Sequence, residues 1–189
     1  MKKAIKILLV FIVLSNSVAN AQYVVKGTNV VSAGIGIGSA IGTYTHSSQS
    51  PGLSVQYERG IWEIPGPGVI SLGGYLGTKS FRNKQYGYTQ NWNYTVIGVR
   101  GAYHYNDLKR FNNKFLNKLD VYGGIMVSFN ILNYSDDYPS GSVYNHDYNS
   151  APGASLFVGG RYFITNNFAV YSELGYGVSI FNIGVSLKF

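Results

Sequence analysis

Three histidines are the side chains of this sequence best suited to proton transfer: His46, His104 and His146. A hydrolase built on one of them needs a serine or aspartate nucleophile beside the base. None of the three lies in a recognisable nucleophile motif. His46 and His146 fall in polar segments rich in serine and in aspartate, respectively, where histidines are usually solvated. We therefore expect no catalytic residue and no enzymatic activity.

Four ionic side chains of opposite sign share one parity of alternating segments: Glu58, Arg100, Arg161 and Glu173. In β-strands, residues of one parity lie on one face. Charges removed from water must pair with opposite charges and hydrogen-bonding groups. The pattern predicts a structural charge network formed by these four residues on an interior face. The alternative is a gated ion path along the same residues.

Motifs for cofactors are absent from the sequence. It contains no metal-ligand spacing, no phosphate-binding glycine loop and no nucleotide motif, and it has no cysteine. We expect no metal, no cofactor and no disulfide. The formal net charge is +7, but its cations are scattered, so nucleic acid is not an expected partner.

The amino terminus has the pattern of a secretory signal. Three lysines precede an apolar run at residues 7–14, and Ala19-Asn20-Ala21 supplies a small-x-small cleavage site. The apolar run is far shorter than the roughly 20 residues of a membrane-spanning helix. We predict a signal peptide at residues 1–21 that is cleaved, and one domain at residues 22–189. Without those lysines, 12 cationic residues stand against 8 carboxylates.

The remainder of the chain alternates between apolar and small or polar residues. Tyrosine (17 residues) and phenylalanine (10 residues) favour strands, and 24 glycines argue against long helices. Period-two alternation predicts eight β-strands, at residues 28–38, 52–60, 69–78, 93–105, 119–131, 153–164, 168–177 and 180–189. The connections largely alternate between long and short. Residues 106–118 break this pattern, as does the short connection near Val178.

The apolar parity of these strands points to lipid rather than to a soluble interior. Across the eight strands it carries one charge, Arg59, whereas the opposite parity collects most charges and glycines. Lipid enforces such sorting, because an Arg or Lys facing mid-membrane costs about 2–4 kcal/mol. Aromatic residues expected near strand ends are typical of a membrane interface: Tyr57, Trp62, Trp92, Tyr103, Tyr105, Tyr162 and Tyr176. A lipocalin-like barrel, with its apolar face inside, is the alternative.

The last predicted strand alternates strictly and ends on an aromatic residue. Its apolar positions are Phe181, Ile183, Val185, Leu187 and Phe189. The segment resembles the terminal strand of outer-membrane β-barrels, which implies that it closes the barrel and acts as the barrel-insertion signal. With the signal peptide and the eight alternating segments, the chain resembles the small eight-stranded barrels of the OmpA-like or OmpX-like kind.

This resemblance implies an all-β fold, a transmembrane antiparallel up-and-down β-barrel, preceded by a cleaved signal peptide. It also implies a monomer in the outer membrane of a Gram-negative-type bacterium, reached through the secretory pathway and the barrel-insertion machinery. We expect an envelope-structural or surface-interaction role. A small pore or transporter for polar solutes is the alternative, and a lipid-modifying enzyme a weaker one.

The longer predicted outer loops are the remaining candidate site. Tyrosine, serine, asparagine and glycine dominate residues 133–152, a composition suited to adaptable contact with a surface ligand. In the predicted loop at residues 79–92, Lys79, Arg82 and Lys84 are placed to meet lipopolysaccharide phosphates. The alternative is that these loops are solvated and have no dedicated partner.

Overall fold

Nearly every described residue of the computed structural model lies in an antiparallel strand or a connection between strands. The structure describes residues 23–39, 48–85, 87–137 and 150–189, so the predicted signal peptide lies outside the described residues. The strands are β1 (Asn29–Ile37), β2 (Ser48–Gln49), β3 (Gly52–Ile64), β4 (Gly68–Gln85), β5 (Tyr88–Tyr105), β6 (Leu119–Asp136), β7 (Ala151–Phe163), β8 (Phe168–Gly175) and β9 (Phe181–Lys188). Two short 3₁₀ helices, η1 (Asp107–Phe111) and η2 (Leu116–Lys118), lie between β5 and β6.

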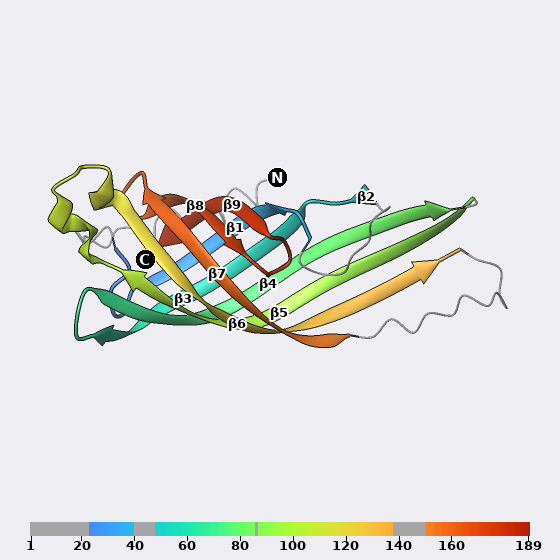
Figure 1. Ribbon diagram of the computed structural model, residues 1–189, viewed down its shortest axis with the longest axis horizontal. Helices are drawn as coiled ribbons and strands as arrows, with labels where there is room; N and C mark the ends of the chain where they lie inside the picture. Colours follow the sequence, from blue (N-terminus) through green and yellow to red (C-terminus); the bar gives the residue numbers. More distant parts are fainter. Residues whose placement is uncertain (1–22, 40–47, 86, 138–149) are drawn as a thin grey trace, which may run out of the picture.

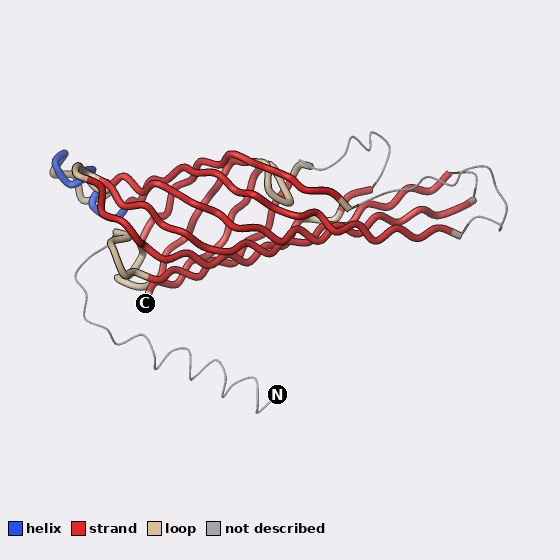
Figure 2. Tube along the Cα trace, turned by 90° about the horizontal axis from the view of Figure 1, so that it is seen from below, coloured by secondary structure: helices blue, strands red, loops and turns tan. Residues whose placement is uncertain are grey.

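Eight of the strands close into a barrel, as predicted (Figures 1 and 2). Each long strand pairs with its sequence neighbour, and β9 pairs with β1 from Val30↔Lys188 to Ile37↔Phe181. The two-residue strand β2 adds to the edge of β4. Closure satisfies the backbone N–H and C=O groups that an open sheet edge would leave unpaired, a requirement for any β structure in lipid.

The outward orientation of the apolar side chains is confirmed. Exposed large apolar residues occur at one parity of every barrel strand, for example Val99 (67%), Leu156 (66%) and Val127 (64%). Charged and small residues of the opposite parity are buried in the lumen. The lipocalin-like alternative, which needs the reverse arrangement, is wrong.

The two ends of the barrel differ. The turn end holds the β3–β4 and β7–β8 turns, residues 106–118 and the ends of β1 and β9. At the loop end, β1, β4, β6 and β8 end and β3, β5, β7 and β9 begin. At the loop end, β4, β5 and β6 continue well beyond the other strands (Figure 1). We call residues 79–85, 88–94 and 131–136 the projecting sheet.

The prediction of a loop at residues 79–92 is wrong, because β4 and β5 pair without interruption from Gly68↔Tyr105 to Gln85↔Tyr88. Alternation persists there with its polarity reversed: Phe81, Trp92 and Tyr94 are buried on the inner face. The outer face carries polar residues such as Ser80 and Asn93. Trp92 is 3% exposed and is therefore not the interface residue that the sequence predicted. The reversal marks where lipid gives way to water.

The turn end contains the helical part of the chain. The β3 strand runs on to Ile64, so the β3–β4 turn is confined to residues 65–67. Among the described residues, no helix is both long enough and apolar enough to cross a membrane.

Candidate functional site in the barrel interior

The barrel lumen is filled by side chains in successive layers, as an eight-stranded barrel allows. Toward the loop end lies an apolar layer in which Tyr75, Val96, Met126, Phe157 and Val178 pack together. Val178 belongs to the short β8–β9 connection, and it is buried in the barrel mouth together with Ser179. A layer of charged residues lies between this apolar layer and the turn end.

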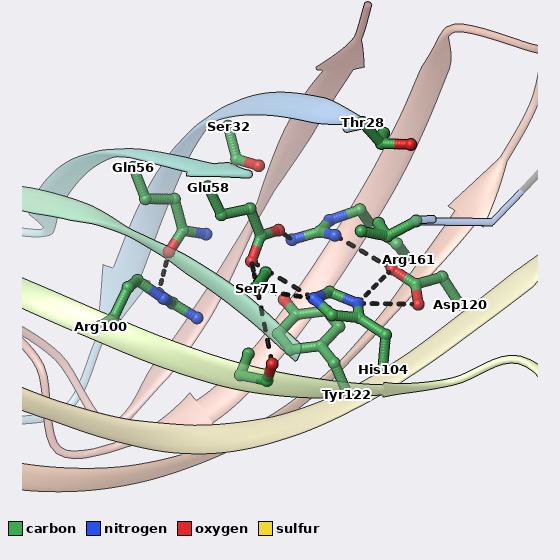
Figure 3. A network of polar contacts seen from close by, with 12 residues as sticks. Thr28, Ser32, Gln56, Glu58, Ser71, Arg100, His104, Asp120, Tyr122 and Arg161 are labelled. Carbon is green, nitrogen blue, oxygen red and sulfur yellow. Dashed lines mark hydrogen bonds and ion pairs between the residues drawn. The ribbon is translucent and has the colours of Figure 1, made fainter. Parts of the chain in front are cut away.

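Arg161 is the centre of the charged layer (Figure 3). Its guanidinium is fully buried and contacts two carboxylates, Asp120 at 3.0 Å and Glu58. Asp120 lies directly opposite Arg161 in the β6–β7 register, whereas Glu58 reaches it from β3. The guanidinium also lies 4.5 Å from the centre of the Tyr122 ring, a cation–π distance.

Arg100 forms a second ion pair farther toward the loop end. Its guanidinium donates to Glu173 at 2.7 and 3.3 Å, and also to the Gln56 side chain. It lies 3.8 Å from the centre of the Phe157 ring. The Tyr122 hydroxyl donates to Glu173 at 3.1 Å, so Tyr122 connects the two ion pairs.

His104 lies between two carboxylates. Nδ1 is 3.0 Å from Asp120 Oδ1, and Nε2 is 3.5 Å from Glu58 Oε2. An acceptor carboxylate on each side favours the imidazolium, in which both nitrogens carry protons. The charged layer then contains three carboxylates, two guanidiniums and one imidazolium, and its charges balance.

Ser71, His104 and Asp120 stand in the order of a hydrolytic triad. Ser71 Oγ is 3.0 Å from His104 Nε2, and His104 Nδ1 is 3.0 Å from Asp120. Three features disfavour catalysis. The Ser71 hydroxyl also faces Glu58 Oε2 at 3.2 Å, Arg161 neutralises Asp120, and Ser71 is only 1% exposed. An imidazolium has no lone pair with which to accept the serine proton.

The four residues that the sequence predicted as an interior network are all buried, and the structure brings each against an opposite charge: Glu58 with Arg161, and Glu173 with Arg100. Sequence reasoning left Asp120, His104, Ser71 and Tyr122 out of this network. Their inward parity was visible in the sequence, but parity does not reveal which inward residues touch. No group of three or more residues among the described ones is arranged to hold a metal ion.

The predicted surface residues have separate positions. Lys79 is 2% exposed and donates to the Gly38 carbonyl from inside the barrel mouth, so its prediction as a surface cation is wrong. Arg82 is exposed on the outer face of the projecting sheet, 2.9 Å from Asn91, and Lys84 is exposed on the same face. His46 and His146 lie outside the described residues, as does most of the predicted loop at residues 133–152; residues 133–136 belong to β6.

The five apolar residues of the predicted insertion signal lie on the outer wall of β9. Ile183, Val185, Leu187 and Phe189 are 43–58% exposed, and Phe181 shares their parity. They are therefore presented to the surroundings of the barrel, where another protein or lipid can contact them. Their role in insertion stays a prediction.

Comparison with solved structures supports the fold and is silent on chemistry. The chain is similar to OprG, an outer-membrane protein of Pseudomonas aeruginosa, with 10% identity, a TM-score of 0.59, and coverage of 90% of this chain and 99% of that one. It is also similar to Ail, the attachment invasion locus protein of Yersinia pestis, solved with the heparin analogue sucrose octasulfate. That match has 11% identity, a TM-score of 0.50, and coverage of 87% and 99%.

No family model and no curated protein matches the sequence. The two similar structures confirm the resemblance to small outer-membrane barrels at the level of the fold.

Proposed function

We propose that this protein is an integral outer-membrane barrel that acts in envelope structure or surface interaction, with neither an open channel nor an enzymatic activity. The observation that carries the proposal is the sorting of side chains in the barrel: an apolar wall faces outward and a charge-balanced layer fills the lumen. This arrangement supports a lipid environment outside the barrel and a closed interior. The protein reaches its membrane as a monomer through the secretory pathway and the insertion machinery.

Location and integration are tested together. Cell fractionation should place the protein in the outer-membrane fraction. The unboiled protein should migrate differently from the boiled protein in a detergent gel, because the closed barrel resists detergent. Recovery in the soluble periplasmic fraction would contradict the proposal.

The pore alternative predicts a different result. Two layers fill the lumen, the charged layer and the apolar layer around Tyr75 and Phe157. Vesicles that contain the folded protein should therefore swell no faster in isotonic sugar than vesicles without it. Steady swelling would favour the small pore for polar solutes.

Among the residues that the structure describes, the enzyme alternative has one geometric candidate, the buried Ser71 with His104. Incubation of the folded protein with phospholipid and with lipopolysaccharide should release no acyl chain. A serine-directed fluorophosphonate should leave Ser71 unlabelled. Acyl release that is lost on Ser71→Ala would establish a lipid-modifying enzyme.

Surface interaction is best supported at the projecting sheet, whose outer face stands above the apolar wall. Arg82 and Lys84 are exposed there beside serine and asparagine side chains. Cations next to an apolar wall suit lipopolysaccharide phosphates or another polyanion. The Arg82→Gln/Lys84→Gln variant should bind lipopolysaccharide more weakly, whereas Lys26→Gln, an exposed change at the other end, should not. Equal binding by all three proteins would leave the sheet without this role.

A further inference from the structure

The connection between β5 and β6 is long for the turn end of such a barrel, where connections are usually short. Its 13 residues, 106–118, carry four cationic residues and one carboxylate, a net charge of +3. Asp107 is paired with Arg110 at 2.9 Å, so the other cations have no carboxylate of this segment to neutralise them. The segment therefore concentrates positive charge at the turn end.

The same segment exposes two aromatic rings. Phe111 is 62% exposed and Phe115 is 55% exposed. An apolar side chain that stays exposed forgoes the favourable free energy of its burial. Two such rings in one short segment indicate that something apolar covers them.

The segment is fixed against the barrel rather than extended away from it. The Tyr23 hydroxyl donates to the Leu116 carbonyl at 3.3 Å, and the Asn106 amide side chain donates to the Val24 carbonyl at 3.0 Å. Phe115 stacks on Tyr162, with ring centres 5.0 Å apart and planes inclined by 22°. Tyr162 belongs to the outward parity of β7, so Phe115 lies against the outer wall.

A surface cleft joins the Phe115 and Tyr162 rings to two of the cations of the segment. It is lined by Lys114, Phe115, Asn117, Lys118 and Tyr162. Its aromatic side is continuous with the apolar wall, because Leu156 and Val158 precede Tyr162 on the same face of β7. Aromatic rings beside cations are the side chains found where the apolar core of a membrane meets its headgroups.

We propose that residues 106–118 form an interfacial anchor that binds an anionic phospholipid in the leaflet at the turn end. Phe115 and Tyr162 contact the glycerol and upper acyl chains, and Lys114 and Lys118 contact the phosphate. This inference rests on the proposed function, since it needs the barrel wall to lie in a membrane. The partner of residues 106–118 is then an anionic phospholipid such as phosphatidylglycerol.

The first test measures depth in the membrane. The sequence has no cysteine, so single substitutions can carry a nitroxide label without background. Labels are placed through Phe115→Cys, through Val158→Cys on the wall, and through Asn166→Cys, an exposed position in the neighbouring turn. In bilayers of phosphatidylcholine and phosphatidylglycerol (3:1), the label at 115 should be accessible to oxygen and protected from a water-soluble nickel reagent, as at 158. The label at 166 should show the reverse.

The second test measures lipid selectivity. Native mass spectrometry of the folded full chain compares the retention of phosphatidylglycerol with that of phosphatidylcholine. A cation near an anionic surface contributes about a fivefold preference. The Lys114→Gln/Lys118→Gln variant should therefore lose at least fivefold of the preference, whereas Arg82→Gln/Lys84→Gln at the loop end should keep it. Heat-modifiable mobility verifies that each variant is folded.

The outcomes separate the two levels of the proposal. Water exposure of the labels at 115 and 158 together would overturn the proposed function. Lipid exposure at 158 with water exposure at 115 would overturn the anchor alone and would favour a soluble partner for the exposed rings. An unchanged lipid preference in the Lys114→Gln/Lys118→Gln variant would likewise overturn the anchor.

Discussion

Replacing Arg161 by methionine should destabilise the barrel more than any other removal of a single charge. The substitution keeps an unbranched apolar stem but removes the guanidinium that contacts Glu58 and Asp120. Because the charges of this layer balance, removal of the Arg161 guanidinium leaves three carboxylates against the two cations Arg100 and His104. One buried negative charge is then uncompensated.

The expected magnitude follows from burial. Breaking a fully buried ion pair by removing one partner costs about 3–5 kcal/mol. Arg161 and Asp120 are 0% exposed and Glu58 is 4% exposed, so solvent screens the remaining charges little. The substitution also removes the cation–π contact between the guanidinium and the Tyr122 ring. Because contacts of one side chain are not additive, the loss of this contact is already included in the 3–5 kcal/mol.

The matched control is Arg110→Met, the same change at a residue that is 66% exposed and paired with Asp107 at 2.9 Å. Exposed ion pairs contribute about 0–1 kcal/mol. Both variants are unfolded in urea after reconstitution, and the folded fraction is read from gel mobility without boiling. Equal slopes against urea are required before the free energies of unfolding are compared.

Coupling provides the decisive comparison. If Glu58 is bound mainly by Arg161, Glu58→Gln in the Arg161→Met background should cost less than in the parent, by about 0.5–3 kcal/mol. Conductance should change little, since the apolar layer around Phe157 is intact. A loss within 1 kcal/mol of that for Arg110→Met, with additive double-variant energies, would refute the view that this network stabilises the barrel.

Three further predictions test the interior. Gly184→Val should abolish the heat-modifiable folded form, because a Cβ at this position would collide with the Ala33 carbonyl where β1 and β9 close the barrel. The control is Gly160→Val, which should fold in the same gel assay, because the atom nearest to a Cβ at Gly160 lies 3.8 Å away. Ser71→Ala should lower the free energy of unfolding in urea by about 1–3 kcal/mol, because it removes the hydrogen bonds between the hydroxyl and the charged Glu58 and His104. Acyl release should not change, and a loss of acyl release in this variant would show that Ser71 is catalytic. Tyr75→Ala should open the apolar layer but change single-channel conductance little, because the charged layer still fills the lumen; a clear rise in conductance would show that the apolar layer alone closes it.

The strands were predictable where lipid sets the pattern. On the barrel wall most outward residues are apolar, so period-two alternation is visible from the sequence without any knowledge of pairing. In the projecting sheet the outer residues face water and the inner ones, such as Phe81 and Trp92, are apolar. The period remains two, but its polarity is reversed and its residues are aromatic and polar. The same physical rule therefore produced a segment that a search for lipid-facing strands assigns to a loop.

The interior network shows what parity cannot supply. Parity places Glu58, Asp120 and Arg161 inside, but their pairing depends on how the strands are staggered around the barrel. Asp120 and Arg161 are paired directly across β6 and β7, whereas Glu58 and Arg161 are 103 residues apart in sequence and lie on strands that are not paired with each other. Charge balance alone does not identify the sixth member either, because Lys188 is also inward. The structure places the Lys188 ammonium 4.9 Å from the centre of the Phe163 ring and His104 between Asp120 and Glu58, so the stagger of the strands, and not parity, decides which carboxylates each inward cation meets.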